Sequence, residues 1–160
     1  MSERKLKYPR ISPEPYKHMM ELGHYLNAGS GLEHTLLEFV KLRSSLLNGC
    51  HFCIDMHTHE LQKLNETPER IAKLTDWRDS DLYTQRERAA LAFAEAITNI
   101  QDGHVPDAVF DAVREHFSEK ETVDLAWAIA QINAWNRMAI TFQPEFRAPG
   151  TAPASVEPVK

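Results

Sequence analysis

The two cysteines of the chain, Cys50 and Cys53, lie in the stretch NGCHFCIDMHTHE, and His57 follows the second cysteine by four residues. A Cys-x-x-Cys pair can be half of a zinc site, a redox dithiol or two core residues. On a helix, spacings of three and four residues place all three side chains on one face. An imidazole one turn from a thiol can accept its proton or stabilise the thiolate. The second thiol can attack an oxidised sulfur and close a disulfide, so the spacing predicts a redox cycle.

The position of Cys50 after a glycine favours the same chemistry. Asn48-Gly49 is typical of the end of one helix, and Cys50 then falls in the first turn of the next. Free backbone N–H groups at a helix start stabilise a thiolate and lower the pKa of a cysteine from its free value of about 8.5. His51 and His59 point away from the face of Cys50 and His57, so we interpret them as surface or packing residues.

Zinc binding and a structural disulfide are the alternatives for this pair. Structural zinc needs four ligands, and Cys50, Cys53 and His57 supply three. The fourth ligand would be a remote residue such as His34 or His104, since the chain has no second Cys-x-x-Cys and no His-x-x-x-His. A disulfide that closes so small a loop stabilises a fold little. Two cysteines without a secretion signal also favour a reducing compartment, where such a pair is more often catalytic or metal-binding.

Helix caps recur along the chain and strand patterns are nearly absent. The sequence predicts helices over 13–28, 32–48, 50–65 and 68–74, a loop over 75–83, and helices that begin after Thr84, Pro106 and Ser118. The last helix should end before Gln143-Pro144. We therefore expect a single all-α helical domain of about six to eight helices over residues 12–147. A loose N-terminal segment (1–11) precedes it, and a tail over 148–160 has the composition of a disordered segment.

Composition limits the partners and the compartment. The net charge is −5 at pH 7 without a Lys/Arg cluster, which argues against nucleic-acid binding. No apolar run reaches the ~20 residues of a membrane span and no signal peptide is visible, so we expect a cytoplasmic protein without a membrane partner. No glycine-rich phosphate loop follows a strand, and we expect no cofactor. The alanine-rich helix and the long tryptophan-bearing last helix carry more apolar surface than one small bundle hides, which predicts a homo-oligomer.

Glu38 stands twelve residues before Cys50 in the apolar stretch TLLEFVKL. Periodicity alone places it near Glu33 and Lys41 on a solvated helix face. Together, Glu38, Cys50, Cys53 and His57 spell E-x11-C-x-x-C-x3-H. This spacing resembles the core signature of the alkyl hydroperoxidase D-like (AhpD-like) branch of the carboxymuconolactone decarboxylase superfamily. The stretches ERAALAFAEAIT and INAWNRMAI resemble the same family, and the likeness runs from about residue 13 to 142.

The resemblance implies an all-helical fold that assembles as trimers or hexamers, and reduction of a small hydroperoxide by a dithiol. Cys53 would be the peroxide-attacking thiolate and Cys50 the resolving thiol. His57 would take the proton from Cys53, and Glu38 would continue the relay. A glutamate buried at that position is expected to have a raised pKa, which suits proton shuttling. An external dithiol or lipoyl-type reductant would reopen the disulfide.

Two other functions stay open on the sequence. Branches of the superfamily that lack the cysteine pair perform lactone decarboxylation, so Glu38 and His57 could serve an acid–base enzyme in which the cysteines are incidental. The chain could also be a metal-binding or redox-sensing helical module without catalysis. Among the other conspicuous side chains, we interpret the tryptophans as core or interface residues and the methionines as packing residues; these are Trp127, Trp135, Met19, Met20 and Met56.

Overall fold

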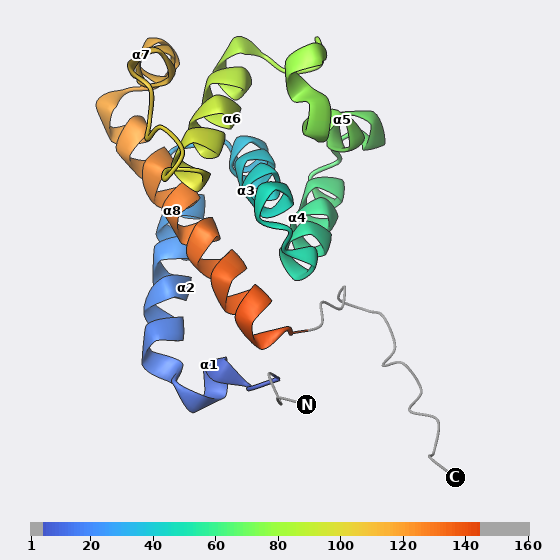
Figure 1. Ribbon diagram of the computed structural model, residues 1–160, viewed down its shortest axis with the longest axis vertical. Coiled ribbons are helices and arrows are strands. Elements are labelled where there is room, and N and C mark those ends of the chain that lie inside the picture. The colour runs from blue at the N-terminus through green and yellow to red at the C-terminus, as the bar shows by residue number, and fades with distance from the viewer. Residues whose placement is uncertain (1–4, 145–160) are drawn as a thin grey trace.

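The structure is a computed structural model that describes residues 5–144, and in this part of the chain helices are joined by turns and loops, without a strand (Figure 1). The helices are α1 (Tyr8–Ile11), α2 (Pro13–Ala28), α3 (His34–Asn48), α4 (His51–Lys63), α5 (Pro68–Lys73), the 3-10 helix η1 (Leu74–Asp79), α6 (Gln85–Thr98), α7 (Asp107–His116) and α8 (Glu119–Phe142). The all-α prediction is confirmed, and the helices form one bundle.

Helix α3 is the centre of this bundle, and it packs against α4, α6 and α8. Its side chains are buried on most of its circumference, including Leu37, Phe39 and Val40. The helix ends at Gly49, whose backbone is left-handed with φ of 66°, a conformation that glycine adopts without a steric cost. The Cys50 amide then donates to the Ser45 carbonyl at 3.0 Å, so the turn leads directly into α4.

Helix α6 lies close to α3, as its alanine-rich sequence predicts. Ala90 and Ala94 are fully buried, because small side chains allow two helix backbones to approach. The same core includes Leu37 and Val40 from α3 and Ile129 from α8. This packing fixes α3, the helix that carries Glu38, against α6 and α8.

The helix starts were predicted well from their caps. Thr84 with Glu87, and Ser118 with Glu121, form the reciprocal hydrogen bonds of two capping boxes at the starts of α6 and α8. The stretch expected to be a loop over 75–83 differs, because Leu74–Asp79 forms η1. Here the Trp77 side chain is buried and its Nε1–H donates to Glu95 Oε1 at 2.9 Å, which ties η1 to α6.

The N-terminal segment was expected to be loose over 1–11, and its described part, residues 5–11, contains a helix instead. Tyr8–Ile11 forms the short helix α1. The Tyr8 ring packs on Tyr16 of α2 and on Phe142 at the end of α8, with ring centroids 6.3 Å and 5.3 Å apart. This aromatic contact holds the segment against the bundle. The predicted tail over 148–160 lies outside the described residues.

Assembly into oligomers stays a prediction, and α8 is the element that bears on it. Val123 and Trp127, one helical turn apart, are 56% and 55% exposed, and Ile140 is 44% exposed. Trp127 is therefore not a core residue of a single chain. Exposed apolar side chains gathered on one helix are typical of a contact with another surface. No helix among residues 5–144 is both long and apolar enough to cross a membrane.

Candidate active site

Cys50 and Cys53 lie at the start of α4, buried between α4 and α8. Cys50 caps the helix, and its Sγ accepts a hydrogen bond from the Cys53 amide at 3.4 Å. The two sulfurs are joined in a disulfide, with the Cα atoms 5.3 Å apart. Both residues are almost fully buried, beside Ala139 of α8 and Phe52. The fold thus places the thiols at bonding distance, in the oxidised form of a dithiol pair.

Glu38 and His57 meet across the contact between α3 and α4. The Nδ1–H of His57 donates to Glu38 Oε2 at 2.7 Å, and Lys41 Nζ donates to Glu38 Oε1 at 2.9 Å. All three residues are buried. The interpretation of Glu38 and Lys41 as a solvated face, drawn from periodicity, is therefore wrong. Lys41 is a member of the site that sequence reasoning missed, although its i+3 spacing from Glu38 pointed to a pair.

The charge of Glu38 also differs from the expectation. Burial alone raises the pKa of this carboxyl, but the hydrogen bond from His57, the charge of His57 and the Lys41 ammonium outweigh it. Together they lower the pKa of Glu38 from its ordinary value of 4.5 to about 2. The prediction of a raised pKa is wrong because it omitted Lys41 and the direct bond to His57. Glu38 is thus an anion at neutral pH, and it orients the imidazole so that Nε2 is left to exchange a proton.

A network of amide side chains, centred on the buried Asn136, fixes the turn that carries Cys50. The Nδ2 group of Asn48, the last residue of α3, donates to Asn133 Oδ1 and Asn136 Oδ1 of α8, both at 2.9 Å. Asn136 is fully buried, and its Nδ2 donates to Ser45 Oγ at 3.0 Å. These bonds join the C-terminal end of α3 to α8 two residues before the first cysteine. A network whose hydrogen bonds are satisfied in this way around a buried side chain holds one geometry.

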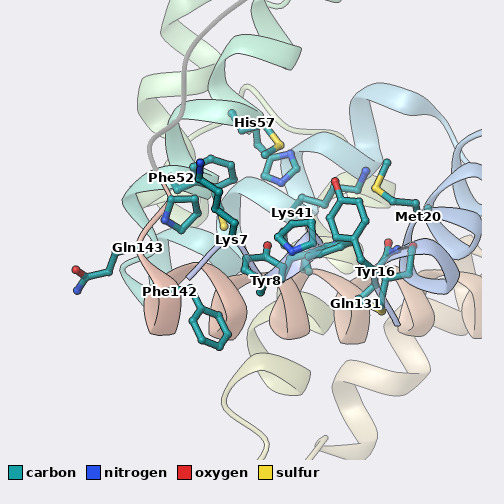
Figure 2. A pocket seen from close by; sticks show the side chains of 18 of the residues that line it. Lys7, Tyr8, Tyr16, Met20, Lys41, Phe52, His57, Gln131, Phe142 and Gln143 are labelled. Carbon is teal, nitrogen blue, oxygen red and sulfur yellow. Dashed lines mark hydrogen bonds between the residues drawn. The ribbon is translucent and has the colours of Figure 1, made fainter. Parts of the chain in front are cut away.

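A cavity of about 820 Å³ opens beside Cys53, between the N-terminal segment, α2, α4 and α8. Cys53, His57 and Lys41 line it, whereas Cys50 and Glu38 do not. Figure 2 shows side chains from these separate elements gathered around one space. The apolar part of its wall comes mainly from Tyr8, Tyr16, Met19, Met20, Phe52, Met56, Ile132, Trp135 and Phe142.

Several of these wall residues were interpreted from the sequence first as packing, core or interface residues. Met19, Met20 and Met56 all line the cavity, and Trp135 does so while its ring meets Tyr16 edge-on at 5.5 Å between centroids. Methionine and aromatic side chains suit a wall that adapts to an organic ligand. Of the two cysteines, Cys53 is therefore the one that borders a largely apolar cavity.

The ligand set suggested for zinc is not assembled in this structure. Among residues 5–144, no three His, Cys, Asp or Glu side chains gather in a way that could hold a metal ion. The sulfurs of Cys50 and Cys53 form a disulfide with each other, and His57 is hydrogen-bonded to Glu38. What the arrangement can do is thiol–disulfide exchange next to an imidazole whose orientation is fixed by a carboxylate.

Comparison with known proteins agrees with this description. The sequence profile of the carboxymuconolactone decarboxylase family matches residues 13–96, which include Glu38, both cysteines and His57. The chain belongs to this family. Its fold and its likeness to solved structures place it in the AhpD-like part of the superfamily.

The similar proteins carry different descriptions. The uncharacterized protein YdfG of Bacillus subtilis (strain 168) is 45% identical over 140 residues, which are 88% of this chain and 94% of YdfG. ATU0492 of Agrobacterium tumefaciens, a protein of unknown function described as a candidate antioxidant defence protein AhpD, is 40% identical with a TM-score of 0.85, over 90% of this chain and 98% of that one. The debrominase Bmp8 is 25% identical with a TM-score of 0.75, over 85% of this chain and 73% of Bmp8.

Proposed function

We propose that the protein is a thiol-dependent hydroperoxide reductase of the AhpD-like type. One observation carries the proposal: Cys53 faces an apolar cavity while its sulfur is within bonding reach of Cys50. A hydroperoxide in the cavity would contact Cys53 alone, because Cys50 does not line the cavity. The description of ATU0492 as a candidate antioxidant defence protein supports the same chemistry.

The first step is nucleophilic attack by the Cys53 thiolate on the distal oxygen of R–O–O–H. The S–O bond forms as the O–O bond breaks, and the electron pair of that bond leaves on the alkoxide oxygen. The alkoxide takes a proton and departs as R–OH. His57, which takes the proton of the Cys53 thiol when the thiolate forms, can give this proton from Nε2, because Glu38 holds the imidazole by its other nitrogen. Cys53 is then a sulfenic acid.

The second step forms the disulfide. The Cys50 thiol attacks the sulfenic sulfur of Cys53, the S–S bond replaces the S–O bond, and the oxygen leaves as water with the thiol proton. An external dithiol then reduces the disulfide by two exchange reactions and becomes a disulfide itself. The sum is ROOH + dithiol → ROH + water + disulfide.

Catalytic turnover tests the proposal. The reduced protein is mixed with cumene hydroperoxide and a small dithiol such as dihydrolipoamide, and loss of hydroperoxide and gain of alcohol are followed by chromatography. We expect one alcohol per dithiol oxidised, at a rate proportional to protein concentration and well above that of the dithiol alone. A rate equal to that of the dithiol without protein would refute a peroxidase function.

A further inference from the structure

We propose that the cavity selects an organic anion, a molecule with a carboxylate at one end and a large apolar body that carries the hydroperoxide. The proposal rests on the proposed function for the chemistry at Cys53, and on the charge and shape of the cavity for the class of substrate. It extends to residues outside the signature, because the N-terminal segment supplies the groups that would bind the carboxylate.

The charge of the cavity wall is opposite to that of the protein. The chain carries a net charge of −5, with 23 acidic and 18 basic residues. The cavity is nevertheless lined by Lys5, Lys7, Arg10 and Lys41, and its lining within residues 5–144 includes no Asp or Glu. A cationic recess on an anionic surface concentrates anions from solution.

Two of these cations are available to a ligand. Lys7 and Arg10 belong to the segment at α1, and their side chains are exposed and make no ion pair or hydrogen bond with any described residue. Lys41 differs, since Glu38 neutralises it deeper in the site. The contact of Tyr8 with Tyr16 and Phe142 holds the segment over the cavity. The packing of Tyr8 therefore places the charges of Lys7 and Arg10 at the rim of the cavity.

The interior of the cavity is large and mainly apolar, so it fits a ligand with a large apolar body. The cavity wall is built mainly from aromatic, thioether and aliphatic groups, and its uncharged polar or titratable members away from the cysteines are His24, Asn27, Gln131 and Gln143. The volume of about 820 Å³ lies in the range of 300–1,000 Å³ that is typical of sites for drug-sized organic ligands. Hydrogen peroxide would occupy a very small part of it. Charge at the rim and apolar surface inside together fit an amphipathic anion (Figure 2).

A matched pair of substrates tests this inference. The probes are linoleic acid hydroperoxide and its methyl ester, which differ in the charge of one end, each used below its micelle concentration. For the wild-type protein we expect kcat/KM about tenfold higher for the acid, the effect of one or two screened ion pairs. The preference should fall towards one as salt is raised to about 0.5 M, because salt screens exposed charges.

Variants that lack the charges at the rim of the cavity test whether those charges cause the preference for the acid. In the double variant Lys7→Gln/Arg10→Gln, the ratio of acid to ester should fall to near one. The double variant Lys63→Gln/Lys73→Gln removes the same charge from exposed positions that do not line the cavity, and it should keep the tenfold ratio. A wild-type ratio near one, or a ratio that survives in the rim variant, would overturn the inference.

Binding of unreactive products separates this inference from the peroxidase proposal. The corresponding hydroxy acid and its methyl ester are titrated into the protein by calorimetry. Tighter binding of the acid, lost in the rim variant, supports the anion site even if neither hydroperoxide is reduced, and in that case the peroxidase proposal alone fails. Equal binding of acid and ester by a protein that reduces both hydroperoxides overturns the anion site and leaves the peroxidase proposal in place.

Discussion

Replacing Cys53 by serine is expected to reduce hydroperoxide turnover by at least about 100-fold, to the rate of the dithiol donor alone. Cys53 is the cysteine that lines the cavity, and a hydroxyl cannot replace a thiolate as a nucleophile towards an O–O bond. The turnover assay with cumene hydroperoxide measures the effect. The far-ultraviolet circular dichroism and melting temperature of the variant show whether the bundle has kept its fold.

The Cys50→Ser variant is the matched control, because it removes the other sulfur from the same buried turn. It should consume one equivalent of hydroperoxide without reductant and then stop, since no thiol can resolve the sulfenic acid. Dimedone should then label Cys53 in this variant, and mass spectrometry should locate the adduct. Turnover of both single variants at the wild-type rate would contradict the mechanism.

Glu38→Gln is expected to lower kcat by about 100-fold, the lower part of the range for loss of acid–base assistance. The amide keeps the shape of the side chain but cannot stabilise a cationic imidazole, and its NH2 group can turn towards Nδ1 of His57. Glu38 does not line the cavity, so we expect KM to change little. Steady-state kinetics between pH 5 and 9 separate the two constants. A reduced kcat/KM that came from KM alone would show that Glu38 acts on substrate binding instead.

The same variant should also be less stable at neutral pH. The folded pKa of Glu38 is about 2 against 4.5 ordinarily, so its carboxylate stabilises the fold above about pH 4.5, and this contribution is lost as pH falls from about 4.5 towards 2. The shift corresponds to about 3 kcal/mol at pH 7. The difference in unfolding free energy between wild type and Glu38→Gln, from urea titrations, should shrink between pH 4.5 and 2.5. A difference that stayed constant over this range would contradict the ion pairs described for Glu38.

The helices of this fold were readily predicted because their signals are local. Capping boxes, Pro13 at the start of α2 and Gly49 after α3 each act within one turn of the chain. The alanines of α6 likewise predicted a close contact, although they could not name α3 as the partner. η1 escaped prediction because it depends on Trp77 reaching Glu95 of another helix.

The candidate site was predictable only in part, for the same reason. Resemblance brought Glu38, Cys50, Cys53 and His57 together by their spacing, and the structure places Glu38 and His57 in contact and the cysteines in a bond. Periodicity placed Glu38 on a solvated face. It could not show that Lys41 of α3 and His57 of α4 both bond the carboxylate and so stabilise it in a buried position. The cavity could not be foreseen, since its wall combines residues from the two ends of the described chain.

The most direct test of the central claim is a thiol titration before and after one equivalent of an organic hydroperoxide, at neutral pH and without metal. The account predicts rapid loss of both thiols per chain, well ahead of a small-molecule thiol, with one alcohol formed and a disulfide between Cys50 and Cys53. Slow loss, at the rate of the small thiol, would contradict the peroxidase proposal and leave the family and the fold unchanged.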